Sequence, residues 1–261
     1  MTMISLKKNT YFSNEANRDY WSVSQFKAFA ECEAAGLASV RGEYVREETD
    51  SLLIGRYVDA YFSGEMDDFI RVDGDKVYQK NGKRYKKFED ADKMIDRVEA
   101  DPLMMEFLNG EKQVIMSAEL FDVPWKIKID CHGGDRIVDF KTVRDFAPVY
   151  KDGLGRVSFI EAWGYDIQGA IYQRIEQIYF GRTEPLPFYL VAVTKEKVPD
   201  IAVIQIPQHV LDTALKIVEA KIDRFDLVKH GDIEPNRCGH CDYCKATKIL
   251  KEPEVFEIEE A

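Results

Sequence analysis

The pattern of hydrophobic and polar positions predicts helices in the first part of the chain and strands after them. Apolar residues at helical spacing predict three helices, over residues 22–30, 52–62 and 88–108. Ser24 is placed to cap the first of these helices. Alternating or continuous apolar runs then predict three strands, over residues 114–121, 125–131 and 136–142.

The second half of the chain continues the pattern with a crossover helix and two more strands. The helix covers residues 159–179 and ends at Gly181. Strands over 188–194 and 201–206 follow, and a last helix covers 207–229. This order of elements predicts an α/β fold with a mixed central β-sheet flanked by helices.

Charged side chains stand out in the predicted hairpin over residues 126–142. Asp130 lies on its first strand, and Asp139 and Lys141 lie on one face of its second strand. Asp-Phe-Lys alone is usually a solvated charge pair, but Ile137, Val138 and Phe140 mark this strand as largely buried, where unpaired charges are costly. Two carboxylates can hold a hard cation beside an ammonium group, as metal-assisted phosphodiester hydrolysis requires.

Composition limits the classes of function. The 261 residues carry a net charge of -11, which argues against nonspecific coating of nucleic acid. A local basic stretch holds five cations, Lys80, Lys83, Arg84, Lys86 and Lys87; it is either a track for a phosphate backbone or a solvated loop. No apolar run approaches the roughly 20 residues of a membrane span, and no secretion signal is evident, so we expect a cytoplasmic protein with no membrane partner.

The chain shows no internal repeat and no linker, so we expect a single domain over 1–261. Its expected parts are an N-terminal helical elaboration at about 1–110, a catalytic core at about 111–230 and a cysteine-rich segment at about 231–250. The acidic tail at 252–260 is expected to fray.

Several motifs together resemble one nuclease family. They are Ser22-Val-Ser-Gln-Phe-Lys27, Gly55-Arg-Tyr-Val-Asp59, Glu119, the Asp130 to Lys141 hairpin, and Gln168 with Tyr172. In order and spacing they resemble the PD-(D/E)xK nuclease superfamily, its RecB-like members, and most closely the phage and prophage RecE-type exonucleases. The resemblance extends over most of the chain and implies a restriction-endonuclease-like core.

The resemblance implies roles for the hairpin residues. Asp130, Asp139 and the main-chain carbonyl of Phe140 would be ligands of Mg²⁺ or Mn²⁺, and two carboxylates with one carbonyl leave room for the waters that magnesium keeps. Lys141 would orient or help deprotonate the attacking water and stabilise charge on the phosphate. Glu119 would assist the metal or the water, or would equally be a surface residue of a strand.

Two further motifs have alternatives. Gln168 and Tyr172 are four residues apart on one helix face, where relatives use such a pair to position the lysine and the DNA. The alternative for this pair is a core tyrosine with a polar neighbour. Asp59 stands where relatives have a metal-binding histidine; it is either a ligand better suited to magnesium or a solvated helix residue.

Three cysteines at Cys238, Cys241 and Cys244 have the spacing of a metal site. Cys32 and His240 are the candidates for a fourth ligand, and some RecB-like relatives hold a 4Fe-4S cluster with one early and three late cysteines. The last gap is shorter here than in those relatives, so Zn²⁺ and a metal-free reduced group remain alternatives. Cys131 is expected to be a small buried residue.

From the resemblance we expect a magnesium-dependent exonuclease acting on double-stranded DNA ends, 5′-to-3′, in phage-type recombination. A single-strand annealing protein as partner and a homo-oligomeric ring follow from the RecE resemblance alone. The alternatives are a structure-specific endonuclease on the same scaffold and a catalytically inert DNA-binding or interaction module built around a cysteine-bound metal.

Overall fold

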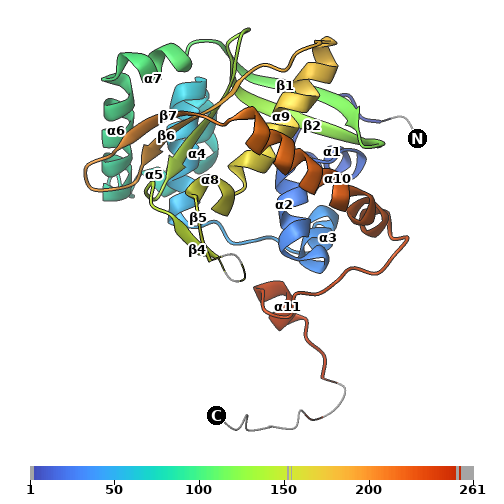
Figure 1. The fold of residues 1–261 in the computed structure, drawn as a ribbon. Helices are drawn as coiled ribbons and strands as arrows, with labels where there is room; N and C mark the ends of the chain where they lie inside the picture. Colours follow the sequence, from blue (N-terminus) through green and yellow to red (C-terminus); the bar gives the residue numbers. More distant parts are fainter. Residues whose placement is uncertain (1–2, 152, 154, 251–252, 254–261) are drawn as a thin grey trace, which may run out of the picture.

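The computed structural model describes residues 3–151, 153, 155–250 and 253. Its centre is a five-stranded sheet in the order β1-β2-β3-β6-β7 (Figure 1). The strands are β1 Glu111–Leu120, β2 Val123–His132, β3 Ile137–Val143, β6 Phe188–Thr194 and β7 Ile201–Gln205. Because β3 and β6 run parallel while the other neighbouring pairs are antiparallel, the predicted mixed sheet is confirmed.

Helices cover both faces of this sheet (Figure 1). One face carries α9 against β1 and β2, with α10 packed on α9 and with α2 and α3 beside them. These helices are α2 Val23–Glu31, α3 Glu33–Arg41, α9 Tyr165–Phe180 and α10 Gln208–His230. The other face carries α4, α6 and α7, with α5 packed on α4. These are α4 Asp50–Ser63, α5 Met66–Val77, α6 Lys86–Glu99 and α7 Pro102–Phe107.

Each face of the sheet has its own apolar core. Trp21 and Trp125 belong to the core beneath α9 and α10, and Phe88 and Phe140 belong to the core beneath α4 and α6. Burying a side chain of this size stabilises the fold by about 2 kcal/mol. The shorter elements are α1 Asn14–Asp19, β4 Val149–Lys151, β5 Gly155–Val157, α8 Phe159–Ala162 and α11 Asp242–Ala246.

Two helices that the sequence predicts as continuous are each broken in the structure. The helix expected over 88–108 is α6 followed by α7, because Pro102 opens a new helix that Asp101 caps. The helix expected over 159–179 is α8 followed by α9, which are separated by Gly164 with φ of 62°.

The helix cap and several short elements also differ from the prediction. Ser22 caps α2 rather than Ser24, because its side chain accepts a hydrogen bond from the Gln25 N–H. The helices α3 and α5 and the β4–β5 hairpin were not predicted. Apart from Pro253, the acidic tail at 252–260 lies outside the described residues. Among the helices that the structure describes, none is long and apolar enough to cross a membrane.

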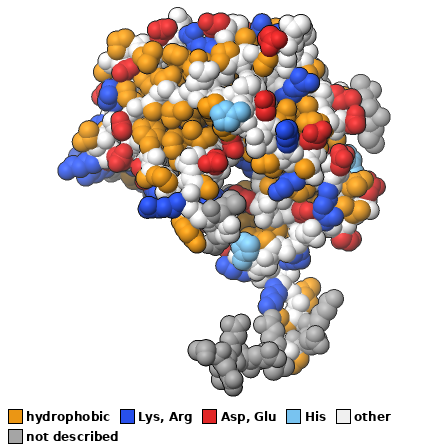
Figure 2. Space-filling model, in the orientation of Figure 1, with side chains coloured by type: hydrophobic (Ala, Val, Ile, Leu, Met, Phe, Trp, Pro, Cys, Tyr) orange, Lys and Arg blue, Asp and Glu red, His pale blue; other side chains and the backbone are white. Residues whose placement is uncertain are grey.

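One edge of the sheet keeps an apolar surface. Figure 2 shows hydrophobic side chains gathered over the part of the molecule where Figure 1 places β6 and β7. Strand β7 is an edge strand whose Ile201 and Val203 are only partly buried. The neighbouring Leu103 on α7 is 52% exposed. The strand at the opposite edge is β1, which pairs with β2.

Candidate active site

The strands β2 and β3 separate where the charged residues of the hairpin lie. Their paired residues are Cys131 with Val138 and His132 with Ile137, next to the turn. Beyond that point Asp130 Oδ2 accepts a hydrogen bond from the Phe140 N–H at 3.0 Å. A carboxylate therefore takes the place of a backbone acceptor, and Asp130 also lines the groove alongside.

Asp139 lies almost fully buried beside Asp130. Its Oδ1 accepts hydrogen bonds from Lys141 Nζ at 2.7 Å and from Gln168 Nε2 at 2.6 Å. Its Oδ2 is buried and has no hydrogen-bond partner among the described residues. Because Phe140 packs in the core beneath α4, its neighbours Asp139 and Lys141 point to the opposite side, toward α9. An unpartnered buried carboxylate oxygen is costly unless a ligand satisfies it.

Lys141 joins the two carboxylates. Its Nζ lies 2.7 Å from Asp139 Oδ1, 3.6 Å from Asp130 Oδ2 and 3.3 Å from the Phe140 carbonyl. Burial lowers the pKa of Lys141, but the charges of Asp139 and Asp130 more than offset this and raise it above the usual range. The side chain is therefore an ammonium group that donates hydrogen bonds.

Two carboxyl groups of the site, those of Asp139 and Asp59, have a raised pKa. Burial raises the pKa of Asp139 to about 7; the Lys141 charge opposes this rise and the Asp130 charge adds to it. Burial also raises the pKa of Asp59 to about 7, and the Asp130 charge is the next cause. Crowded carboxylates of this kind favour binding of a hard cation, which removes their mutual repulsion.

Asp59 reaches the site because α4 lies close to β3. A Cβ atom at Gly55 would be 3.0 Å from Thr142 Oγ1, so only glycine permits this approach without displacement. Asp59 follows one helical turn later on the same face. It lines a groove of about 870 Å³ together with Asp130. The structure therefore brings Asp59 near Asp130, while its role as a metal ligand stays a prediction.

The residues present fit a divalent metal ion. Carboxylate and carbonyl oxygens are the ligands that magnesium and manganese prefer. Asp130, Asp139, Asp59 and the Phe140 carbonyl would hold the ion, and the buried Oδ2 of Asp139, which has no hydrogen-bond partner among the described residues, supports this fit most directly.

Gln168 and Tyr172 also lie at the site, on α9. Gln168 binds Asp139 directly, as described above. Both residues line a smaller pocket of about 260 Å³ beside Asp130 and Lys141. Burial raises the pKa of Tyr172 well above its ordinary value, which keeps the phenol neutral. Tyr172 is also a buried member of the core beneath α9 and packs on Phe188, so the alternative of a core tyrosine with a polar neighbour stays open.

The smaller pocket adds lysines to which the sequence analysis gave no role. Lys27 on α2 donates a hydrogen bond to the Trp163 carbonyl at 2.9 Å, and burial with the nearby charge of Lys141 lowers its pKa to about 8. Lys126 donates to the Tyr11 carbonyl, and burial lowers its pKa to about 8. The alternation of Lys126, Lys128 and Asp130 along β2 was a signal that could have found the second of these lysines.

Gln113 on β1 was missed as well. It stands opposite Asp130, between the pairs Lys112 with Cys131 and Val114 with Ile129. Its φ of 54° is strained for a residue other than glycine, and its side chain lines the larger groove. Both of its amide atoms are buried without a hydrogen-bond partner in the described part of the chain. No pattern in the sequence marks this position.

The structure does not bring Glu119 to the site. Glu119 is exposed and pairs with Pro124, which is six residues before Asp130 on β2, or about 20 Å along the strand. The basic stretch also lies apart: Arg84 pairs with Asp92 at 2.6 Å and Lys87 pairs with Asp50 at 2.6 Å. None of its five cations lines the groove or the smaller pocket.

The cysteines form a second candidate site. The sulfur atoms of Cys32, Cys238, Cys241 and Cys244 all lie within 4.8 Å of one another. Cys32 lies between α2 and α3, and the other three lie at or just before α11. His240 is exposed and its ring contacts the Cys238 carbonyl, so Cys32 is the fourth member. Cys131 is buried elsewhere, against the Phe107 carbonyl.

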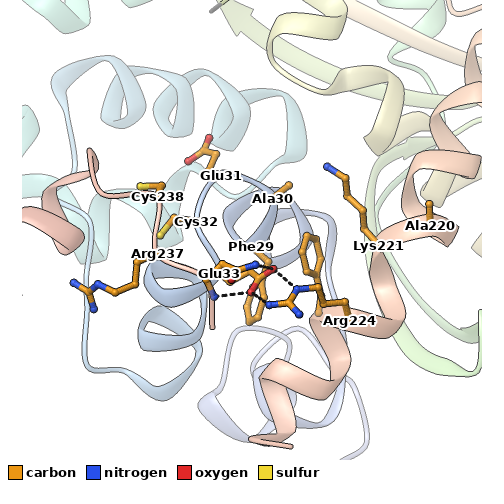
Figure 3. Close-up of a pocket in the computed structure, with 12 residues that line it drawn as sticks. Phe29, Ala30, Glu31, Cys32, Glu33, Ala220, Lys221, Arg224, Arg237 and Cys238 are labelled. Atoms are coloured by element: carbon orange, nitrogen blue, oxygen red, sulfur yellow. Dashed lines mark hydrogen bonds and ion pairs between the residues drawn. The ribbon is translucent and has the colours of Figure 1, made fainter. Parts of the chain in front are cut away.

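Polar contacts fix the segment that carries the late cysteines. Figure 3 shows Cys32 and Cys238 beside a cavity of about 350 Å³ in which Glu33 faces Arg224. Glu33 accepts hydrogen bonds from Arg224 at 2.8 Å and from the Asn236 N–H at 2.7 Å. These contacts join α3 to α10 and to the cysteine-rich segment. The donor set of four clustered thiols fits a soft or borderline metal.

Comparisons with known proteins agree with this geometry. Residues 22–247 match the family described as a PDDEXK-like domain of unknown function (DUF3799). The crystal structure of a putative exonuclease from Eubacterium rectale is 38% identical, with a TM-score of 0.91 and 97% of each chain covered. The structure of SSO0001 aligns over 84% of this chain and 90% of its own, but its 15% identity and TM-score of 0.28 are too low to bear on the fold.

No curated protein matches the chain. The family match covers most of the sequence, and it includes the hairpin carboxylates, Lys141, Gln168 and the four clustered cysteines. The resemblance to PD-(D/E)xK proteins is thereby confirmed, whereas the closer likeness to RecE-type exonucleases stays a prediction. The chain belongs to the PDDEXK-like family of DUF3799 domains.

Proposed function

We propose that the chain is a magnesium-dependent deoxyribonuclease that removes nucleotides from the ends of double-stranded DNA. The observation that carries this proposal is Asp139, buried between Lys141 and Gln168 with one oxygen left without a partner in the described part of the chain. Family membership supports nuclease chemistry, and the 38% identical Eubacterium rectale protein, by its name, supports exonuclease action.

Each residue of the site has a distinct role in this proposal. Asp130, Asp139, Asp59 and the Phe140 carbonyl would hold the metal ion. A bound magnesium ion supplies positive charge beside the phosphate and lowers the pKa of a water near it. Lys141, held as an ammonium group, donates to the phosphate oxygen on which negative charge grows. Gln168 fixes the orientation of Asp139 by its 2.6 Å hydrogen bond.

The finer parts of the proposal rest on the likeness to RecE-type exonucleases. They are the 5′-to-3′ direction, a role in recombination, a single-strand annealing protein as partner, and a ring of several subunits. Light scattering on free and DNA-bound protein tests the ring, and a monomer in both states would remove it from the proposal. The direction is tested by the cleavage experiment that follows.

The test of the activity is degradation of linear duplex DNA labelled at its 5′ or 3′ ends, with a closed circular duplex alongside. Each is incubated with magnesium or with EDTA. The proteins are the wild type, Lys141→Ala and the matched control Lys93→Ala, whose exposed lysine lies on α6 and pairs with Asp90. We expect magnesium-dependent loss of linear DNA from the 5′ end, retained in the control and reduced by several orders of magnitude in Lys141→Ala.

Other outcomes would favour the rival functions. Cleavage of the closed circle would replace the exonuclease with an endonuclease on the same scaffold. Binding of DNA ends without cleavage by the wild type would favour an inert binding module. Equal activity in Lys141→Ala and the wild type would mean that the hairpin group is not the active site.

We also propose that the four cysteines hold one zinc ion rather than a 4Fe-4S cluster. A tetrahedral zinc site with bonds of about 2.3 Å sets its thiolates about 3.8 Å apart. The sulfur of Cys244 lies 3.5 Å from that of Cys32 and 3.9 Å from that of Cys238. A cluster places each thiolate on a different iron and so spreads them further apart than these distances.

Elemental analysis of protein purified without added metal tests the zinc assignment. We expect one zinc per chain in the wild type and in Cys131→Ser, and none at this site in Cys238→Ser. Iron with acid-labile sulfide in equal amounts would show a cluster instead. A wild-type protein free of both metals would remove the metal from the proposal.

A further inference from the structure

Two cavities meet at Asp130, and three residues line both of them. The larger groove of about 870 Å³ and the smaller pocket of about 260 Å³ share Phe12, Lys128 and Asp130. Lys128 and Asp130 are two positions apart on β2, so their side chains leave the same face of the strand. Phe12 and Lys128 therefore form a ridge between the two cavities, next to the candidate metal ligands.

Phe12 is an exposed ring on a fixed support. It is 70% exposed, whereas the preceding Tyr11 is buried. Lys126, itself buried, donates a hydrogen bond to the Tyr11 carbonyl. The ring of Phe12 packs edge-on against that of Tyr11, with centroids 4.9 Å apart. Tyr11 is thereby held in place, and the Phe12 ring packs against it with most of its own surface open to solvent.

The segment that carries Phe12 is also fastened on the far side of the groove. Lys8 Nζ lies 2.8 Å from Glu65 Oε1 and 3.3 Å from Asp68 Oδ2, at the start of α5. The Tyr11 N–H donates to the Lys7 carbonyl at 2.9 Å, which closes a turn between these contacts. The ridge therefore has supports on both sides, from Lys126 in the core and from α5 across the groove.

The ridge pairs an aromatic ring with a cation. Lys128 Nζ lies 5.1 Å from the centroid of the Phe12 ring. Proteins that bind single-stranded nucleic acid use this combination, because a ring stacks on any base and a cation meets the phosphate that follows it. The smaller pocket suits a phosphate-bearing strand, since Asp130 is its one acidic lining residue against four lysines, Lys27, Lys126, Lys128 and Lys141.

We propose that Phe12 stacks on the base of an unpaired nucleotide at the DNA end, with Lys128 on the adjoining phosphate. The strand to be cut enters the smaller pocket, which the ridge separates from the larger groove. This inference rests on the proposed nuclease function and adds to it the binding site for the terminal nucleotide. The site is then expected to bind DNA ends whose terminal bases are unpaired in preference to fully paired duplex ends.

The binding test uses a duplex with 2-aminopurine as the terminal base, whose emission responds to stacking. Lys141→Ala serves as the parent protein so that the DNA persists. Into it are added Phe12→Ala, the conservative Phe12→Tyr, or the control Tyr150→Ala, which removes another aromatic residue that is 70% exposed but lies on β4. Because Phe12 is exposed, its replacement is not expected to affect folding.

We expect binding to change the emission in the parent protein, in the Phe12→Tyr variant and in the Tyr150→Ala variant, and not in the Phe12→Ala variant. Affinity for an end with two unpaired bases should fall on the order of tenfold with Phe12→Ala. The same probe placed within the duplex should be insensitive to Phe12. An unchanged signal and affinity in Phe12→Ala would overturn the proposal.

Different experimental results would contradict the stacking site and the nuclease function. Loss of the emission change in Phe12→Ala, in a protein that never cleaves DNA, would still establish the stacking site. Cleavage by the wild type with the same KM for duplex ends in a Phe12→Ala enzyme with Lys141 intact would overturn the stacking site alone.

Discussion

Gln168 on α9 donates a hydrogen bond to Asp139 on β3 at 2.6 Å. The bond joins the crossover helix to the second strand of the hairpin, across 29 positions of sequence. Asp139 is therefore positioned from two directions, because Lys141 reaches the same oxygen from its own strand. A carboxylate held in this way presents its free oxygen in one fixed direction.

Loss of the Gln168 contact should lower turnover more than stability. We expect Gln168→Met to reduce kcat by about 10- to 100-fold, as removal of groups that orient metal ligands commonly does. Steady-state kinetics with saturating magnesium and a thermal melt check the two quantities. Arg174→Met, an exposed change on the same helix, is the matched control. Equal kcat in both variants would mean that Asp139 keeps its orientation without Gln168.

We expect Gln113 to lower the stability of the fold while it supports cleavage activity. Because its buried amide atoms lack partners in the described part of the chain, we expect Gln113→Met to raise the free energy of unfolding by about 1 kcal/mol. Urea denaturation in EDTA measures this change. The same variant should cleave DNA more slowly, because the amide lines the groove beside Asp130. A lower free energy of unfolding would show that the amide has a partner in solution.

Gly55 sets the distance between α4 and β3. We expect Gly55→Ala to lower nuclease activity, because the added Cβ would push the helix that carries Asp59 away from Thr142. Thr142→Ala in the same chain should restore part of the loss. Activity at limiting magnesium is the measurement, since a displaced ligand weakens metal binding.

A second helical glycine provides the control for Gly55. At Gly74 on α5 the nearest atom to an added Cβ is Ile70 Cγ2 at 3.6 Å, an ordinary contact. Gly74→Ala should therefore keep full activity, because the added Cβ is accommodated without displacing α5. Equal effects of the two substitutions would show that the approach of α4 to β3 does not depend on Gly55.

Lys229 should make stability depend on pH. Burial lowers the pKa of Lys229 to about 7; Asp226 and Asp19 oppose this shift and Lys126 adds to it. An unfolded lysine stays protonated to about pH 10. Between pH 7 and 10 the unfolded chain therefore binds more protons than the folded chain, and stability rises with pH.

The variant Lys229→Met isolates this effect. The difference in unfolding free energy between wild type and variant should grow in favour of the wild type from pH 7 to pH 10, by about 1.4 kcal/mol for each unit of the pKa shift that is realised. Urea titrations at several pH values measure it. A constant difference would mean that Lys229 is charged throughout, held by its hydrogen bonds to the Tyr20 carbonyl and Gln25.

The hairpin carboxylates could be predicted from the sequence because their signal is local. Alternation along β2 and β3 determines which residues share a face, and a short turn fixes the two strands as neighbours. Asp130, Asp139 and Lys141 meet in the structure for these reasons. The contact of Gln168 with Asp139 was not predicted, since the spacing of residues on one helix does not reveal what the helix packs against; the resemblance implied only that Gln168 and Tyr172 position the lysine and the DNA.

Positions that depend on register or on strained backbone could not be predicted. Glu119 was expected either to assist the metal or to be a surface residue of a strand, and the pairing of β1 with β2 places it opposite Pro124, at the other end of the strand from Asp130. The same register places Gln113 opposite Asp130, and its positive φ has no sequence signal. The sequence does not distinguish Phe12 from other exposed aromatic residues; its position between two cavities is evident only from the structure.

The contacts around α3 connect the two ends of the chain. Glu33 is held by Arg224 and Asn236, which lie 191 and 203 positions away, and Cys32 meets Cys244 across 212 positions. During synthesis these partners emerge 191 to 212 residues after α3 begins, so α3 remains without them over that interval. Since α2 carries Lys27 into the smaller pocket and packs against α3, that pocket wall is connected through α3 to contacts that span about two hundred residues of sequence.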